Sequence, residues 1–203
     1  MIIAANKIGF DLDGVIADTA ESFLRIACSK YGYCSFTPED FTNFELQNCI
    51  PIPHDLVDKI FTEILTDSLG TGLKPMKGAV ETLTLLAQTS TITIITARPL
   101  LSPVLDWIDA FFPTKTRDAT QVVATGDHND KVRHIHKHGL KYFVDDRIET
   151  CLQLANSNIT PLVFSQPWNK NRHDMQRVEN WSDVRNLLTP FPEKFDEMPT
   201  LQL

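Results

Sequence analysis

The sequence contains no long hydrophobic run, no paired-cysteine motif and no excess of basic residues. Because no apolar stretch approaches the roughly 20 residues of a transmembrane helix, we expect no membrane partner. The opening residues, MIIAANKIGF, lack a basic segment followed by a long apolar one, which predicts no secretory signal. The four cysteines form no CxxC pair, and we expect them to be reduced thiols of a cytoplasmic protein. The formal net charge of -7 argues against binding to a nucleic-acid polymer, which requires a basic face.

What the chain does contain is an ordinary globular composition and a regular alternation of short apolar strands with helices. Its 203 residues are 42% hydrophobic and 22% charged, which is enough for one substantial core and a small second lobe. Strands are predicted at residues 7–12, 91–95, 120–124, 140–144 and 159–164, and helices at residues 77–88, 102–112, 130–138 and 148–156. Short β-branched strands separated by helices predict an α/β fold, in which a parallel sheet carries helices on both faces.

A helical segment interrupts this alternation after the first strand. Asp18 and Glu21 have capping-box spacing at the start of a predicted helix that Gly32 can end. Residues 37–41, TPEDF, have a helix-start pattern, and residues 53–65 are amphipathic with helical spacing. We therefore expect this segment to fold as a separate small lobe.

The interruption predicts two domains. The core would comprise residues 1–17 and 76–203, and the helical lobe would comprise residues 18–75. The end of the chain, from Thr189, contains three prolines and is expected to be an irregular arm.

Polar residues gather at the predicted ends of the strands. Ligands of an open parallel sheet bind beyond the carboxyl ends of its strands, so residues at these positions carry the functional information. Four carboxylates, a hydroxyl and a lysine occupy them: Asp11 and Asp13 after the first strand, Thr96 after the second, Lys131 beyond the third, and Asp145 and Asp146 after the fourth.

This order of motifs, DxDG, then T, then K, then DD, resembles the haloacid dehalogenase superfamily of phosphatases. The resemblance covers the whole chain and implies a Rossmann-like parallel sheet of strand order 5-4-1-2-3, with a helical cap inserted after the first strand. Residues 164–169, FSQPWN, and residues 178–184, VENWSDV, are similar to the end of bacterial members of the 5'(3')-deoxyribonucleotidase family.

The resemblance implies that Asp11 is the nucleophile and forms an aspartyl-phosphate. Asp13 would donate a proton to the ester oxygen and then take one from the water that hydrolyses the intermediate. Two ionised carboxylates this close repel each other, which favours keeping one of them protonated until it is needed. Gly14 would let the backbone approach the transferring group, and its amide is expected to face a phosphate oxygen.

The remaining carboxylates imply a magnesium ion. Mg²⁺ prefers oxygen ligands and often takes one or two protein carboxylates together with phosphate and water. We expect Asp11, the main-chain carbonyl of Asp13 and Asp146 to be direct ligands. Asp145, the other acidic member of this metal site, would act through water or orient Lys131.

The substrate phosphate is expected to contact the residues that follow the second and third strands. Thr96 would hydrogen-bond a phosphate oxygen, and Lys131 would neutralise the charge that develops during transfer. The substrate-binding set also includes Gly14, Ala97 and Arg98. An arginine near the start of a loop is common, so Arg98 is interpreted equally well as a structural residue.

The aromatic residues of the lobe and one loop histidine have two interpretations each. Phe36, Phe41, Phe44 and Phe61 can form the core of the lobe, or one of them can face a nucleobase. His128 can contact substrate, or it can simply be solvated.

The sequence thus predicts a Mg²⁺-dependent phosphomonoesterase that acts on a small phosphorylated substrate, most simply a nucleoside monophosphate. A phosphatase for a small sugar phosphate or organic acid phosphate would use the same residues, and a phosphomutase would share Asp11 and Asp13. The dehalogenase branch does not need Asp13. A non-catalytic binding module would be expected to lack the nucleophile or Lys131, and this chain has both. Whether the chain forms a homodimer is left open.

Overall fold

The core of the protein is a six-stranded sheet in the order β3-β2-β1-β4-β5-β6. The structure is a computed structural model, and it describes residues 2–170 and 174–188. The strands are β1 (Ile8–Phe10), β2 (Ile92–Thr96), β3 (Thr120–Ala124), β4 (Tyr142–Asp145), β5 (Thr160–Phe164) and β6 (Arg177–Val178). Every neighbouring pair is parallel. The predicted order 5-4-1-2-3 is therefore confirmed, and β6 extends it beyond β5.

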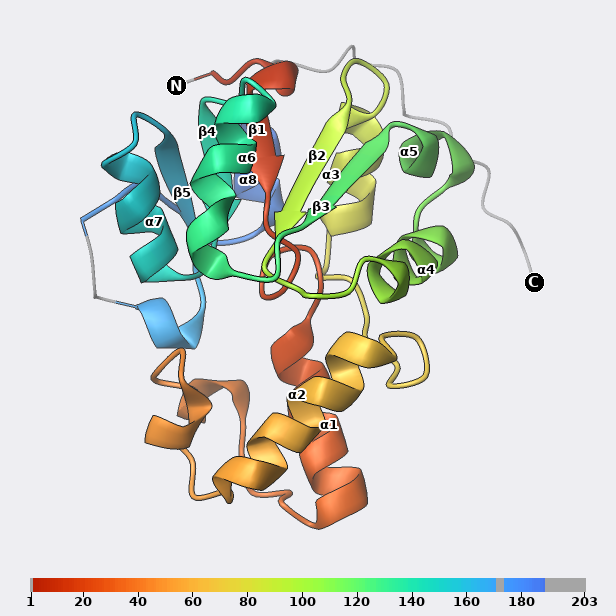
Figure 1. The fold of residues 1–203 in the computed structure, drawn as a ribbon, viewed down its shortest axis with the longest axis vertical. Helices are drawn as coiled ribbons and strands as arrows, with labels where there is room; N and C mark the ends of the chain where they lie inside the picture. Colours follow the sequence, from red (N-terminus) through yellow and green to blue (C-terminus); the bar gives the residue numbers. More distant parts are fainter. Residues whose placement is uncertain (1, 171–173, 189–203) are drawn as a thin grey trace.

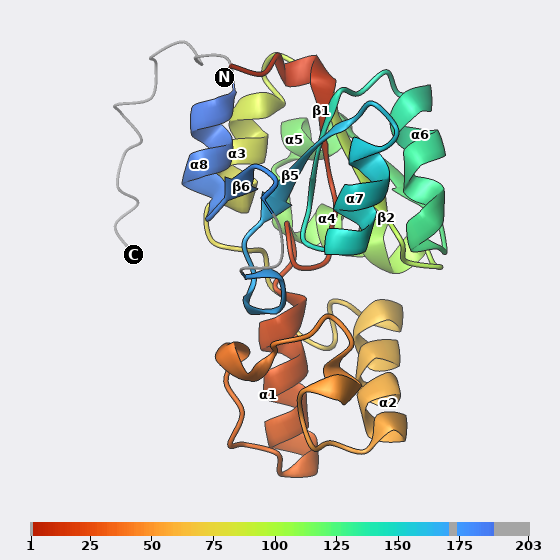
Figure 2. The same cartoon turned by 90° about the vertical axis from the view of Figure 1, so that its left-hand side faces the viewer.

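Helices cover both faces of this sheet, as the alternation predicts. They are α3 (Ala79–Leu86), α4 (Ser102–Phe111), α5 (Thr114–Asp118), α6 (Lys131–Lys137), α7 (Ile148–Ala155) and α8 (Trp181–Leu187). Figure 2 shows α6 and α7 on one face and α3 and α8 on the other. All residues of β1 and β2 are buried, as expected for central strands that are covered on both sides.

Helix α8 was not predicted, although its start has a clear signal. The side chain of Asn180 accepts hydrogen bonds from the amides of Ser182 and Asp183, which is an N-cap. Trp181 is buried, and its ring lies 5.4 Å from that of Phe10 in β1. The helix therefore joins the end of the described chain to the central strand.

A small helical cap follows β1 and lies beyond the carboxyl ends of the strands (Figure 1). It contains α1 (Thr19–Tyr31) and α2 (His54–Thr66). Asp18 accepts a hydrogen bond from the Glu21 amide at 3.1 Å, and Gly32 ends α1 with a φ of 79°, so both helix signals are confirmed. The helix-start pattern at residues 37–41 yields only one 3-10 turn, η2 (Pro38–Asp40).

The expectation of four reduced thiols is wrong for two of them. Cys28 and Cys34 form a disulfide, because the left-handed turn at Gly32 brings the chain back beside the end of α1. Cys49 and Cys151 are free thiols. Disulfides are rare in the cytoplasm, so this pair does not support the predicted location.

Two further expectations concern the ends and the environment of the chain. The predicted irregular arm from Thr189 lies outside the described residues. Among the helices that the structure describes, none is both long and apolar enough to cross a membrane.

Candidate active site

The ends of β1 and β4 bring two carboxylates to the ammonium group of Lys131. Asp11 follows β1, and Asp145 is the last residue of the neighbouring strand β4. The Nζ atom of Lys131, at the start of α6, lies 2.8 Å from Asp11 Oδ2 and 2.7 Å from Asp145 Oδ2. All three side chains are buried, so these charge-assisted contacts hold the nucleophile candidate in one orientation. Asp145 therefore lies where it can orient Lys131, as predicted.

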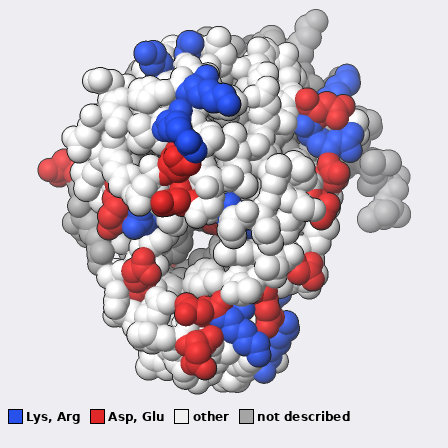
Figure 3. Space-filling view, viewed as in Figure 1, with Lys and Arg blue, Asp and Glu red and all other residues white. Residues whose placement is uncertain are grey.

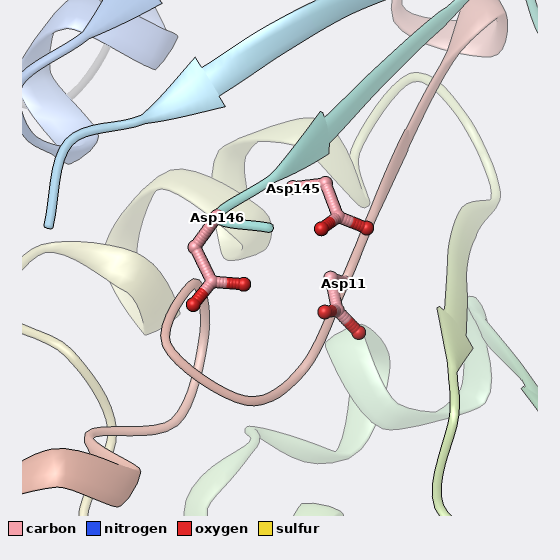
Figure 4. A group of neighbouring side chains, drawn as sticks. All are labelled: Asp11, Asp145 and Asp146. Carbon is pink, nitrogen blue, oxygen red and sulfur yellow. The ribbon is translucent and has the colours of Figure 1, made fainter. Parts of the chain in front are cut away.

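A third carboxylate completes a buried acidic group. Asp11, Asp145 and Asp146 each offer one oxygen, and these oxygens lie within 4.8 Å of one another. Figure 4 shows the three side chains pointing toward a common space from the ends of β1 and β4. Three carboxylates face one lysine here, so with all three ionised the group would carry negative charge that a divalent cation can neutralise. The residues present therefore fit a metal ion with oxygen ligands.

The ionisation of this group reflects its burial. Burial raises the pKa of Asp11 to about 7, although Lys131 acts in the opposite direction. Burial also raises the pKa of Asp146 well above its usual range, and the neighbouring Asp145 and Asp11 raise it further. For Lys131, burial acts to lower the pKa, but the two carboxylates outweigh it and the lysine stays charged. The metal-free site thus favours protonated acids, and a cation would favour their ionised forms.

Two residues of the loop after β5 donate hydrogen bonds to Asp146. The indole Nε1 of Trp168 donates to Asp146 Oδ2 at 3.1 Å. The side-chain amide of Asn169 donates to the carbonyl oxygens of Asp146 and Phe164, both at 2.8 Å. Both residues therefore tie the loop after β5 to a candidate metal ligand. A direct link to Asp146 was not predicted.

The absence of a side chain at Gly14 leaves room for the Asp146 carboxylate, while the Gly14 amide is already hydrogen-bonded. Its N–H donates to the carbonyl of Ala17 at 2.9 Å, so the expectation that this amide faces a phosphate oxygen is not met in this structure. The φ of Gly14 is 71°, and a Cβ at this position would collide with the Asp146 carboxylate. Glycine therefore allows the turn after β1 to pass directly beneath Asp146.

Asp13 is held by three donors. The Nε and Nη2 atoms of Arg98 lie 2.8 Å from its Oδ2 and 2.7 Å from its Oδ1, and Thr19 Oγ1 donates to Oδ1 at 2.6 Å. Burial acts to raise the pKa of Asp13, but Arg98 and Thr19 outweigh it and lower the pKa below its usual value. Arg98 was predicted to contact substrate, and in this structure its guanidinium binds Asp13 instead of standing free. Thr19 was not predicted to contact the site.

A cavity of about 320 Å³ connects these residues to the cap. Asp11, Asp13, Thr96, Ala97 and Arg98 line it from the core. Figure 3 shows the molecule hollowed between the core and the cap. The predicted phosphate-binding residues after β2 therefore share one cavity with the two acids that follow β1.

The cap side of the cavity is mainly apolar. Phe41, Phe44, Leu46, Phe61 and Leu65 line it, together with the polar residues Glu45, Gln47 and Asp58. Phe41 and Phe61 also pack on the buried Phe23, so they form part of the core of the cap as well as lining the cavity. That one cap aromatic faces a nucleobase stays a prediction.

Phe44 of the cap lines the cavity and contacts two residues of the core. Its ring lies 5.7 Å from the ring of His128 and 5.1 Å from the guanidinium of Arg147. Burial lowers the pKa of His128, with Lys131 and Arg147 adding to the effect, so its imidazole is neutral. His128 lines the cavity and is not simply solvated.

Solved structures share this architecture. A haloacid dehalogenase-like hydrolase from Streptococcus pneumoniae aligns with a TM-score of 0.59 at 13% identity, covering 90% of this chain and 96% of that one. The structure of CbbY from Rhodobacter sphaeroides in complex with phosphate aligns with a TM-score of 0.58 at 14% identity, covering 91% of this chain and 96% of that one. At these identities the likeness shows the fold alone. No curated protein matches the sequence.

A family model makes the closer connection. The model described as "5' nucleotidase, deoxy (Pyrimidine), cytosolic type C protein" matches residues 5–191, which is most of the chain and includes every candidate site residue. The protein therefore belongs to this family of haloacid dehalogenase-like phosphatases.

Proposed function

We propose that the protein is a Mg²⁺-dependent nucleotidase that hydrolyses deoxyribonucleoside monophosphates through an aspartyl-phosphate on Asp11. The observation that carries this proposal is one cavity with two unlike ends. The core end holds Asp11 and Asp13, and the cap end presents apolar and aromatic side chains. The first suits a phosphate group and the second suits a nucleobase.

In the first half of the reaction, an Asp11 carboxylate oxygen attacks phosphorus and the bond from phosphorus to the ester oxygen breaks. Asp13 donates a proton to the departing oxygen, which leaves as the nucleoside hydroxyl. Lys131, held 2.8 Å from Asp11 Oδ2, neutralises charge on the transferring group. Thr96 is 1% exposed and lines the cavity beside the phosphate position, where its hydroxyl can donate to an oxygen.

In the second half, water attacks phosphorus and the bond to Asp11 breaks. Asp13 takes the proton from this water, so inorganic phosphate leaves and both acids return to their starting states. The three donors around Asp13 favour the carboxylate that this step requires.

The metal would be held by Asp11, the main-chain carbonyl of Asp13 and Asp146. When bound, Mg²⁺ supplies positive charge to the phosphate oxygens and keeps Asp11 ionised. Asp145 is engaged with Lys131 and with the Arg147 amide, which supports an indirect role for it.

We further propose that residues 18–75 act as a cap that sets substrate preference. The core handles the phosphate, so discrimination must come from groups remote from it. A base stacked on an aromatic side chain gains about 1–3 kcal/mol, or roughly ten- to a hundredfold in affinity. Phe44 suits this role, because it lines the cavity and its ring contacts His128 and Arg147 of the core.

The test is phosphate release from deoxyribonucleoside 5'- and 3'-monophosphates, ribonucleotides, sugar phosphates and phosphoglycolate with the purified chain and Mg²⁺. We expect a deoxynucleotide to give the highest kcat/KM. Phe44→Leu should lower that value about tenfold or more and leave acetyl phosphate hydrolysis within about threefold. Phe36→Leu, a cap phenylalanine outside the cavity, is the matched control.

Two results would change the conclusion. Sugar or organic acid phosphates turned over best, with nucleotides at background, would leave a phosphatase of another specificity. No hydrolysis of any ester, together with ligand binding, would indicate a non-catalytic module.

A further inference from the structure

Arg98 occupies an unusual position between the acid of the site and the connection to the cap. It is 3% exposed, and its guanidinium makes contacts on three of its nitrogen atoms. Nε and Nη2 grip the two oxygens of Asp13, while Nη1 donates to Ser68 Oγ at 2.6 Å. Ser68 is itself buried and its hydroxyl donates to the Ile64 carbonyl in α2. The guanidinium is therefore held by Asp13 on one side and by Ser68 on the other. It cannot reorient without breaking these buried contacts.

The hydrogen bonds leave one position open on Asp13. A carboxylate has about four acceptor positions, two on each oxygen. Oδ1 already accepts from Arg98 Nη2 and Thr19 Oγ1, whereas among the described residues the only donor to Oδ2 is Arg98 Nε. One lone pair on Oδ2 is thus available to take a proton, and the two-pronged grip of Arg98 fixes its direction.

We propose that Arg98 is a positioning residue, which orients Oδ2 of Asp13 to accept the proton from the water that hydrolyses the phosphorylated Asp11. This inference rests on the proposed aspartyl-phosphate function. In the step concerned, the water oxygen bonds to phosphorus, the bond from phosphorus to Asp11 breaks, and the water proton passes to Oδ2. The two hydrogen bonds from the guanidinium fix the orientation of this carboxylate, so removal of the guanidinium should slow this half of the reaction most.

Phosphorylation of Asp11 by 4-nitrophenyl phosphate isolates this half. The 4-nitrophenolate ion leaves without a proton, so formation of the aspartyl-phosphate needs little help from Asp13. Breakdown of the aspartyl-phosphate still needs a base. Since kcat/KM reports the steps through departure of the nitrophenolate and kcat reports the slowest step, the two constants separate the halves.

For Arg98→Gln we expect kcat to fall about a hundredfold, in the range of a misplaced general base. KM should fall with it, so that kcat/KM for 4-nitrophenyl phosphate stays within about threefold. Rapid mixing should show a burst of nitrophenolate, and acid-quenched protein should carry a phosphoryl group on Asp11 by mass spectrometry. In an Asp13→Asn background, Arg98→Gln should cost less than about threefold more, because it acts through Asp13.

Two more conservative variants test the same role in case Arg98→Gln does not fold. Arg98→Lys retains the charge but cannot present two N–H groups in a fixed fork, so it should show the same kinetic pattern. Ser68→Ala removes the hydrogen bond to Nη1 of Arg98. It should show the same kinetic pattern with a smaller effect, a fall in kcat of about tenfold.

Arg25→Gln is the matched control. Arg25 also contacts a carboxylate and a serine hydroxyl, those of Glu21 and Ser22, and it reaches the cap connection through the Gly72 carbonyl. It does not line the cavity, so both constants should stay within about twofold of wild type.

The outcomes separate this inference from the proposed function. A wild-type chain that hydrolyses no phosphate ester and forms no phosphorylated Asp11 overturns both. An active wild type whose Arg98→Gln variant loses kcat/KM with a raised KM shows that Arg98 binds substrate phosphate directly, which overturns the positioning role alone. Equal loss of kcat and kcat/KM without accumulated phosphoenzyme also overturns it.

Discussion

Replacing Trp168 by phenylalanine tests whether the carboxylate of Asp146 holds the metal. The indole Nε1 donates to Asp146 Oδ2 at 3.1 Å, and both side chains are buried. Phenylalanine keeps an aromatic ring at this position but removes the donor. Asp146 would then be free to rotate about its side-chain bonds, and one of its oxygens would lose its only side-chain donor among the described residues.

The magnitude follows from the type of contact. A hydrogen bond to a charged group contributes about 1.5–3 kcal/mol, and removal of a donor that orients a metal ligand typically costs about 10–100-fold in metal affinity. At about 1.4 kcal/mol for each factor of ten, these two ranges agree. We therefore expect Trp168→Phe to raise the Mg²⁺ concentration for half-maximal activity about 10–100-fold, with little change of kcat at saturating Mg²⁺.

The assay is phosphate release across a Mg²⁺ titration, with thermal unfolding measured in parallel. Trp181→Phe is the matched control, because its indole is also buried and donates to a carbonyl, that of Val15, at 2.8 Å. It should lower the unfolding temperature but leave the half-maximal Mg²⁺ concentration within about twofold. An unchanged Mg²⁺ requirement in Trp168→Phe would refute the role of Asp146 as a ligand.

Three further outcomes are expected. Asp11→Asn should lower turnover at least about a thousandfold, because it removes the negative charge of the attacking oxygen. Near-normal phosphate release from the pure variant would contradict the proposed mechanism. EDTA should abolish activity and Mg²⁺ should restore it, whereas Ca²⁺ should restore little because it prefers longer bonds and more ligands; full activity in chelator would contradict the metal site. In the metal-free chain, burial raises the pKa of Asp11 from 3.8 to about 7, so the folded state binds a proton that the unfolded state has lost. Urea unfolding should therefore show stability falling as the pH rises from about 4 to about 7, and Asp11→Asn should flatten this trend.

The arrangement of the sheet could be predicted because it depends on local patterns and a general rule of topology. Short β-branched strands alternate with helices, and parallel strands place their carboxyl ends at one edge. The prediction therefore placed Asp11, Thr96, Lys131 and Asp145 near one another before any contact was known. The strand β6 was missed because it has only two residues and no periodicity to detect.

Two other features had a recognisable signal in the sequence, but the signal did not specify which structure would form. The TPEDF pattern forms its cap, since the Thr37 amide donates to Asp40 at 2.7 Å, yet the helix stops after one turn. A capping box favours a start and does not specify a length. The Cys28–Cys34 pair likewise depends on how sharply the chain turns at Gly32, which cysteine spacing alone does not reveal.

By itself, the sequence determined which chemical groups stand at the strand ends and in what order, because strand ends are set by local apolar patterns. Only the tertiary structure decided which partner each group takes. Arg98 is 85 residues from Asp13, and Trp168 is 22 residues from Asp146. These pairs form because packing of the cap and of the loop after β5 brings each buried donor beside a carboxylate that is distant in the sequence, and no local pattern encodes that choice.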